Sequence, residues 1–212
     1  MHISVVDYGL GNLLSVARAL EACGARCEMV GTASDLEKAD KLLLPGVGAF
    51  PSGMEGLRAL DLVEPLRDYA ASGRPLLGIC LGMQLLMDVS HEFGVHEGLG
   101  LIGGSVRPVE RIAVDGSPLK TPHIGWSQLS KPAGCTSWRG SLLENLDENS
   151  HAYFVHSYAV VPDDDGSRIA ECEYGGQRIT AAVRRNNVHG LQFHPEKSGE
   201  VGLRILTTFI QS

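Results

Sequence analysis

The sequence predicts an α/β fold with a mostly parallel central sheet flanked by helices, and with antiparallel strands in the C-terminal half. In the N-terminal half, short apolar segments alternate with segments whose apolar residues recur every three or four positions. This alternation is typical of strand–helix repeats around a parallel sheet. In the C-terminal half, short β-prone segments are separated by turns rich in glycine and aspartate, which favours antiparallel strands and hairpins.

The N-terminal half supplies the expected parallel strands. Asn12 is expected to begin the first helix, because Asn is a favoured N-cap and the apolar residues after it keep helical spacing. Gly56–Ala71 carries a further helical pattern. The expected strands are His2–Val6, Cys27–Val30, Lys41–Leu44 and Pro75–Ile79. In a sheet of this kind, ligands bind at the carboxyl ends of the strands.

The C-terminal half supplies the expected antiparallel strands and a closing helix at Glu200–Gln211. The strands are expected at Leu101–Val109, Tyr153–Val161, Arg168–Glu173, Ile179–Val183 and Val188–Phe193. The chain has no internal repeat and no low-complexity linker. We therefore expect one domain that spans residues 1–212.

Composition excludes several classes of protein. A net charge of −7 argues against general binding to nucleic acid or to a membrane surface. No apolar run reaches the length of a membrane span, and no signal-peptide pattern opens the chain. The five cysteines are odd in number and lack framework spacing, so we expect a reducing, cytoplasmic setting. Neither His91, Glu92 and His96 nor Cys23 and Cys27 match a zinc spacing, so we expect no metal and no cofactor.

Cys80 stands at a predicted strand–turn–helix junction. Gly78 and Gly82 remove side chains that would collide in so sharp a turn. Such a turn presents its central residue above the sheet, and the amide of Leu81 at the helix start is placed to face an oxyanion. A helix N-terminus also lowers the pKa of a thiol. The alternative is a small cysteine buried for packing.

His194 and Glu196 follow the last predicted strand. A cysteine nucleophile needs a base to take its proton and a third group to orient that base. Residues two apart on a strand project to the same side, so His194 is expected to meet Cys80 while Glu196 holds the other imidazole nitrogen. A plain surface turn is the alternative for this pair.

The segment 45–48 is a glycine-containing loop after a predicted parallel strand. In a parallel sheet this loop would lie at the same edge as Cys80, and the amides of Val47 and Gly48 would supply the second oxyanion donor. The segment lacks the Lys-Ser/Thr ending of a phosphate-binding loop. An ordinary turn is the alternative.

Three segments together resemble the class I, triad-type glutamine amidotransferases, which have a flavodoxin-like fold: Pro45-Gly-Val-Gly48, Gly78-Ile-Cys-Leu-Gly-Met-Gln84 and Phe193-His-Pro-Glu196. Along nearly the whole chain, further segments are similar to the glutaminase subunits of imidazole glycerol phosphate synthase. They are Asp7-Tyr-Gly-Leu-Gly-Asn12, Pro122-His-Ile-Gly-Trp126, Tyr153-Phe-Val-His-Ser-Tyr158 and His194-Pro-Glu-Lys-Ser198.

The resemblance implies a chemistry and a substrate. Cys80 attacks the side-chain amide of L-glutamine, and His194 protonates the departing ammonia and later activates water for hydrolysis of the thioester. The oxyanion lies between the Leu81 amide and the 45–48 loop. The residues implied in glutamine binding are Gly46, Gly48, Gln84, Glu92, His156, Ser157 and Tyr158.

The resemblance also implies a partner, a TIM-barrel cyclase subunit that forms a heterodimer and receives the ammonia in histidine biosynthesis. The positions implied at that interface are Asn12, His123, Trp126 and Lys197. Ser127 departs from the family, which usually has Asn there, and this puts one interface hydrogen bond in question. The segment 128–141, with Cys135 and Trp138, is expected to be a variable surface loop.

Three other functions stay open at this stage. One is an amidotransferase subunit of another pathway, such as anthranilate, guanylate or pyridoxal phosphate synthesis. Another is a non-catalytic homologue, which the intact Cys80, His194 and Glu196 disfavour. The third is a cysteine hydrolase that acts on peptides or γ-glutamyl groups.

Overall fold

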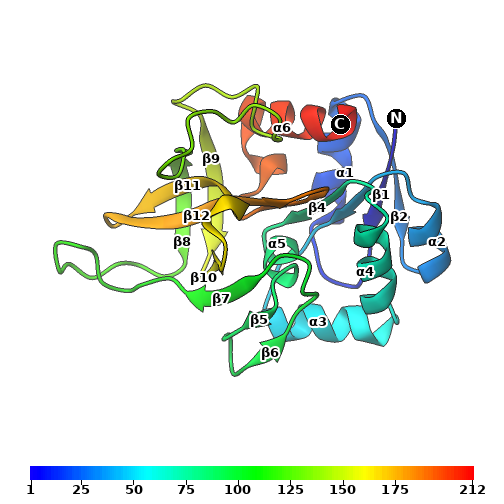
Figure 1. The fold of residues 1–212 in the computed structure, drawn as a ribbon, viewed down its shortest axis with the longest axis horizontal. Helices are drawn as coiled ribbons and strands as arrows, with labels where there is room; N and C mark the ends of the chain where they lie inside the picture. The colour runs from blue at the N-terminus through cyan, green and yellow to red at the C-terminus, as the bar shows by residue number, and fades with distance from the viewer.

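The computed structural model describes residues 1–212 and has a seven-stranded central sheet (Figure 1). Its strand order is β11-β12-β13-β4-β3-β1-β2, and the pairs from β13 through β2 are all parallel. The strands β11, β12 and β13 pair antiparallel and extend one edge. The bounds are β1 His2–Val6, β2 Arg26–Val30, β3 Leu42–Leu44, β4 Leu76–Ile79, β11 Arg168–Tyr174, β12 Gln177–Arg185 and β13 Val188–Leu191.

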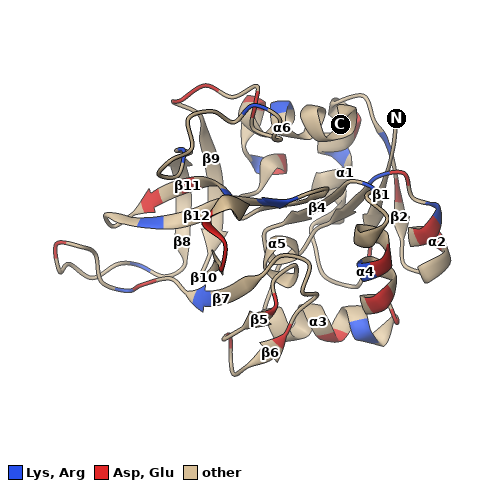
Figure 2. Cartoon of the chain, in the orientation of Figure 1, with Lys and Arg blue, Asp and Glu red and all other residues tan.

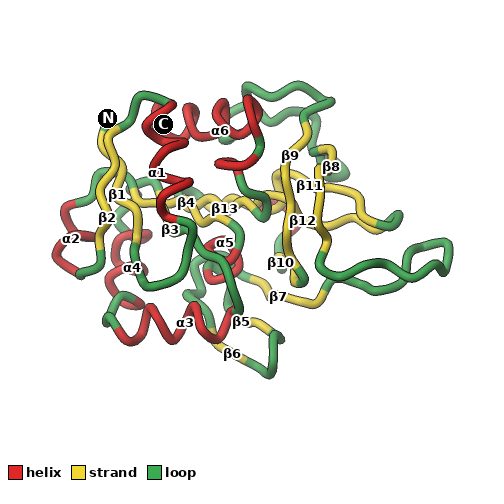
Figure 3. Tube along the Cα trace, turned by 180° about the vertical axis from the view of Figure 1, so that it is seen from behind, coloured by secondary structure: helices red, strands yellow, loops and turns green.

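Helices cover both faces of this sheet, as Figures 1 and 3 show from opposite sides. One face carries α1 and α6, whose Leu20 and Phe209 are fully buried in one apolar cluster. The other carries α3 and α4, whose Leu57 and Leu66 belong to a second cluster. The bounds are α1 Leu13–Ala22, α2 Ala33–Lys38, α3 Phe50–Ala59, α4 Val63–Ala71, α5 Leu81–Leu85 and α6 Gly199–Gln211. The predicted fold class is confirmed.

Two smaller sheets lie beside the central one. A four-stranded sheet has the order β10-β7-β5-β6, and β8 pairs antiparallel with β9. The bounds are β5 Val89–Ser90, β6 His96–Glu97, β7 Gly104–Pro108, β8 His123–Gln128, β9 His151–His156 and β10 Tyr158–Pro162. These sheets place the expected antiparallel half of the chain next to the carboxyl ends of the parallel strands.

Several expected boundaries are wrong. The helical pattern of Gly56–Ala71 is two helices, because the chain turns between them at Asp61, whose φ is +53°. The expected strand Tyr153–Val161 is two strands in different sheets, divided at Ser157. The short helix α2 and the strand β8 were not predicted from the sequence.

Charged residues of both signs are interspersed along the outer helices and loops (Figure 2). On α4, for example, Arg67 lies 2.6 Å from Glu64. No helix is both long enough and apolar enough to cross a membrane.

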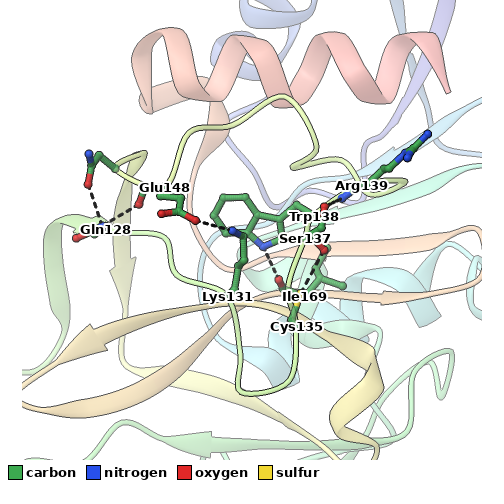
Figure 4. Close-up of polar contacts among 9 residues, drawn as sticks. Gln128, Lys131, Cys135, Ser137, Trp138, Arg139, Glu148 and Ile169 are labelled. Atoms are coloured by element: carbon green, nitrogen blue, oxygen red, sulfur yellow. Dashed lines mark hydrogen bonds and ion pairs between the residues drawn. The ribbon is translucent and has the colours of Figure 1, made fainter.

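The segment after β8 is anchored by a buried tryptophan (Figure 4). Trp138 is 5% exposed, and its indole N–H donates to the carbonyl oxygen of Ile169 at 2.8 Å. The Lys131 ammonium lies 5.5 Å from the centre of the indole ring and 2.9 Å from a carboxylate oxygen of Glu148. The expectation of a plain surface loop was therefore wrong for Trp138, which belongs to the core.

Replacing Trp138 with alanine is expected to lower the free energy of unfolding by about 3–5 kcal/mol, since a large buried side chain and its hydrogen bond are lost. Trp126 is the matched control, because it is the only other tryptophan and is 56% exposed. Trp126→Ala is expected to change the free energy of unfolding by no more than about 0.5 kcal/mol. Urea denaturation followed by far-UV circular dichroism measures both, and equal losses would contradict an anchoring role for Trp138.

Candidate active site

Cys80 occupies a strained turn between β4 and α5. Its φ is +54° and its ψ −110°, a conformation that costs a residue with a side chain on the order of 1–3 kcal/mol. A Cβ at Gly82 would overlap the carbonyl oxygen of Leu44, and one at Gly78 would lie 2.7 Å from the carbonyl group of Gly82. Only glycines therefore allow α5 to come this close to β3 and β4. The turn presents the thiol at the carboxyl end of the parallel sheet.

Glu196 and His194 form a buried pair beside Cys80. The Nδ1–H of His194 donates to Oε1 of Glu196 at 2.7 Å, and the two side chains are 3% and 2% exposed. The expected strand alternation is not what aligns them. The strand β13 ends at Leu191, and the pair lies in a turn that includes the short 3-10 helix Pro195–Lys197.

The environment of His194 favours its protonated form. Burial of the imidazole lowers its pKa, but the interactions with Cys80 and Glu196 outweigh burial and raise the pKa to about 9. The Nε2 atom of His194 is buried without a regular hydrogen bond, on the side where Cys80 and His194 line the same cavity. An imidazole that holds a proton this firmly is suited to accept one from a thiol.

The expected oxyanion donors do not all point into the cavity. The amide of Leu81 donates to the carbonyl oxygen of Gly46 at 3.3 Å, so it is engaged within the protein. The hydroxyl of Tyr8 donates to the carbonyl oxygen of Pro45 at 2.8 Å and fixes the start of the same loop. Val47 and Gly48 line the cavity, and Gly48 has a φ of +112°, which favours glycine.

One cavity of about 380 Å³ is lined by Cys80 and His194 together with most of the residues implied in glutamine binding. Gly46 is the exception. It does not line the cavity and packs against Tyr8 and Leu81. The cavity is lined by Val47, Gly48, Cys80, Leu81, Gln84, Glu92, Pro122, Val155, His156, Ser157, Tyr158 and His194. A carboxylate, an imidazole, an amide and a thiol therefore converge on a space of small-molecule size.

Two of these polar residues are already partly engaged. The carboxylate of Glu92 accepts the backbone N–H of Phe50 at the start of α3, at 2.7 Å. The side-chain amide of Gln84 donates to the carbonyl oxygen of Tyr158 at 2.9 Å and to the side-chain oxygen of Gln192 at 3.1 Å. This leaves the Gln84 side-chain oxygen and the second oxygen of Glu92 for a ligand.

The residues expected at an interface divide into two groups. Asn12 and Lys197 are exposed, and Trp126 is 56% exposed, packed edge-on against Tyr153. Trp126 lies on strand β8. His123 is only 2% exposed, so its expected place on the surface was wrong. Its side chain is held inside by hydrogen bonds to His156 and Ser127.

Gln192 is a site residue that the sequence analysis missed. It is fully buried, and its side-chain amide lies 3.9 Å from the Cys80 sulfur, within the range of a weak N–H···S hydrogen bond. On the opposite side, the Cys80 thiol lies 3.9 Å from the carbonyl oxygen of Val155. The signal for Gln192 was its position two residues before His194.

A larger hollow of about 530 Å³ lies between β7, β10, β11 and β12. Two of its three arginines, Arg168 and Arg178, already bind the buried Glu171, at 3.0 and 3.3 Å. The lining of this hollow includes no cysteine and no histidine, whereas the smaller cavity has both Cys80 and His194.

Comparison with known proteins assigns this arrangement to a family. The family model described as "Glutamine amidotransferase class-I" matches residues 4–211. The chain belongs to the class I glutamine amidotransferases. It also belongs with the HisH subunits of imidazole glycerol phosphate synthase, the glutamine amidotransferase subunits of that enzyme in histidine biosynthesis. The resemblance stated from the sequence motifs is confirmed.

The relatives are similar over their whole length. A chain of Legionella pneumophila named imidazole glycerol phosphate synthase subunit HisH 1 is 50% identical, over 99% of this chain and 98% of its own length. The HisH subunit of Gloeothece citriformis is 45% identical, over 98% and 94% of the two lengths. The HisH subunit of Geobacillus thermodenitrificans is 46% identical over the same shares.

Several solved structures share the fold at lower identity. A crystal structure of a glutamine amidotransferase aligns with a TM-score of 0.73 at 20% identity, over 99% of this chain and 97% of that one. The structure of PurLQS from Thermotoga maritima aligns with a TM-score of 0.71 at 22% identity, over the same shares. These likenesses concern the fold alone.

Replacing Glu196 with glutamine is expected to lower the pKa of His194 from about 9 by about one unit or more, because a buried carboxylate no longer stabilises the imidazolium. In the parent, this protonation stabilises the fold fully below the unfolded pKa of about 6.5, and the contribution disappears as pH rises through about 9. The variant should lose part of that pH dependence, because the interaction with Cys80 still raises the pKa of His194.

An NMR titration of the histidine Cε1–H signals measures the shift. His189 is the internal control, because it is buried without a carboxylate partner and burial lowers its pKa to about 4. An unchanged His194 pKa in Glu196→Gln would show that Glu196 does not act on the imidazole.

Proposed function

We propose that this chain hydrolyses L-glutamine to glutamate and ammonia, and passes the ammonia to a cyclase subunit of imidazole glycerol phosphate synthase. The observation that carries the proposal is the buried hydrogen bond from His194 to Glu196 beside Cys80, in a cavity lined by polar groups. The printed names of the relatives, which describe them as subunits of that synthase, support the same assignment. The chain acts as a single domain over residues 1–212, in the cytoplasm.

The triad divides the reaction into two steps. The Cys80 thiol gives its proton to Nε2 of His194, and the sulfur attacks the carbonyl carbon of the glutamine side chain. His194 then protonates the leaving nitrogen, the C–N bond breaks and ammonia departs, which leaves a glutamyl thioester. Water deprotonated by His194 cleaves the thioester to glutamate and returns the thiol. Glu196 stabilises the imidazolium in both steps.

The oxyanion of each tetrahedral intermediate needs two N–H donors. We assign them to Leu81 and to the 45–48 loop, through the amide of Val47 or Gly48. The Leu81 amide donates to the Gly46 carbonyl oxygen at 3.3 Å. A peptide group of this loop therefore has to rotate before both N–H donors can face the oxyanion. The loop is thus the element whose movement raises activity when a partner docks.

Substrate recognition follows from the charges of free glutamine. The carboxylate of Glu92, which is buried, suits the substrate ammonium, and the polar groups of Ser157 and Tyr158 suit its carboxylate. His156 is neutral, because burial lowers its pKa to about 4. Gly46, Gly48 and Gln84 complete the binding set, with Gln84 one turn beyond Cys80 on α5.

The partner is a TIM-barrel cyclase subunit that docks over the cavity in a heterodimer. Ammonia released into water is protonated to ammonium, which is not a nucleophile, so a covered route to the acceptor preserves it. Exposed Trp126, Asn12 and Lys197 supply the docking contacts, and an exposed aromatic side chain is a common anchor of interfaces. The reaction itself needs no metal and no cofactor.

Cys80→Ala is expected to reduce glutamate release from glutamine by at least about a thousandfold, since removal of a triad nucleophile costs several orders of magnitude. Cys135→Ala is the matched control and should keep the parent rate, because Cys135 is only half-buried and lies outside the cavity. Glutamate is measured enzymatically, with and without the cyclase subunit. Full activity in Cys80→Ala, or cleavage of γ-glutamyl peptides in preference to glutamine, would overturn the proposal.

Trp126→Ala is expected to weaken binding of the cyclase subunit at least tenfold, the effect of truncating an aromatic anchor. Leu60→Ala is the control, because Leu60 is 44% exposed at the end of α3, away from β8. Isothermal titration calorimetry measures both affinities. Equal affinities for the two variants would place the interface elsewhere, and no complex with the parent chain would refute the assigned partner.

A further inference from the structure

Four side chains and one carbonyl group connect strand β8 to the glutamine cavity through a chain of hydrogen bonds. Ser127 Oγ lies 2.9 Å from Nε2 of His123, and Nδ1 of His123 lies 3.0 Å from Nε2 of His156. Nδ1 of His156 lies 2.8 Å from the carbonyl oxygen of Tyr158. That same oxygen accepts the side-chain amide of Gln84 at 2.9 Å. None of these hydrogen bonds involves Cys80, His194 or Glu196.

The carbonyl of Tyr158 fixes the direction of every bond between it and Ser127. A carbonyl oxygen only accepts, so Nδ1 of His156 carries the proton and its Nε2 is an acceptor. Nδ1 of His123 must then be the donor to that Nε2, which makes Nε2 of His123 an acceptor. The hydroxyl group of Ser127 is the only donor left for this nitrogen. One arrangement of protons satisfies the whole set.

Both imidazoles are held in the neutral form that this arrangement requires. Burial lowers the pKa of His123 and that of His156 to about 4. Phe154 and Tyr174 both stack on the His123 ring, with centroids 5.2 and 4.2 Å away, and prevent it from turning. The ring orientation and the tautomer are therefore fixed by separate contacts.

The chain continues beyond Tyr158 to the nucleophile. The amide of Gln84 also donates to the side-chain oxygen of Gln192 at 3.1 Å, and the amide of Gln192 points to the Cys80 sulfur at 3.9 Å. The Tyr158 oxygen accepts hydrogen bonds from both sides and has no proton to donate onward. The chain is thus suited to hold positions and is unsuited to proton transfer.

We propose that Ser127 and His123 are positioning residues that hold His156 in its Nδ1–H tautomer within the glutamine cavity, and that Gln192 extends the same network to Cys80. The inference rests on the proposed function, since it deepens the assignment of His156 to substrate binding. Ser127 is half-buried and adjacent to the exposed Trp126 on β8. A partner seated on β8 would therefore act on the first bond of the network.

The test compares two variants of Ser127 in the full chain labelled with ¹⁵N-histidine. Ser127→Ala removes the only donor to Nε2 of His123, so part of His123 should take the Nε2–H form and the His156 nitrogen signals should shift with it. Ser127→Thr keeps a hydroxyl and should restore the parent spectrum. Ser105→Ala is the control, because Ser105 is a half-buried serine on β7 whose hydroxyl binds Arg107 outside the network.

Kinetics supply the second readout. In Ser127→Ala, KM for glutamine should rise about fivefold, the effect of one neutral hydrogen bond, while kcat changes less than twofold. Ser127→Thr and Ser105→Ala should keep the parent KM. Unchanged histidine signals in Ser127→Ala, or the same shift in Ser105→Ala, would overturn the proposal. The NMR readout needs no glutamine, so it decides this point even if the parent chain lacks glutaminase activity.

A further variant tests the link to the thiol. Gln192→Met has a similar shape but no N–H donor, so alkylation of Cys80 by iodoacetamide at pH 7 should slow at least threefold, because the thiolate loses a donor. The modified Cys80 peptide is quantified by mass spectrometry, and circular dichroism shows whether the variant is folded. A folded Gln192→Met chain that is alkylated at the parent rate would exclude Gln192 from the network.

Discussion

The close contact between the start of α5 and the end of β3 is the constraint on which the site depends. Gly82 lies so near the Leu44 carbonyl that a side chain there would overlap it. This approach leaves the chain no room for a relaxed turn, so Cys80 takes a positive φ and its thiol faces the cavity. The same approach brings the loop after β3 alongside the Leu81 amide. The Cys80 thiol and the 45–48 loop are thus positioned together by backbone packing.

Strands β4, β3 and β13 are adjacent in the sheet, and each contributes to the site at its carboxyl end. β4 leads to Cys80, β3 to the 45–48 loop, and β13 to Gln192 and the His194–Glu196 pair. The cavity is closed from the other side by the break between β9 and β10 at Ser157. Because that break sends its two strands into different sheets, the residues around it face the cavity.

The sequence was sufficient for the α/β class, the parallel half of the sheet and the grouping of Cys80, His194 and Glu196, because periodicity and glycine placement are local signals. It did not predict the break at Ser157, because β-prone residues continue on both sides of the position where the chain passes from one sheet to another. It was also insufficient for His123 and Gln192, since their burial depends on Phe154, Tyr174 and Cys80, which are distant in the chain or on other strands. The anchoring of Trp138 to Ile169 is non-local in the same way.

The hydrogen bond from the Leu81 amide to the Gly46 carbonyl oxygen limits how far a partner could raise turnover by moving this loop. One neutral hydrogen bond contributes about 1 kcal/mol, which would leave roughly one chain in six open at any moment. If the loop also has to release the Tyr8 hydroxyl from Pro45, the open share falls to roughly one in thirty. A docked partner that shifts this equilibrium fully would then raise turnover about thirtyfold, so the isolated chain would hydrolyse glutamine at roughly one-thirtieth of the rate in the complex.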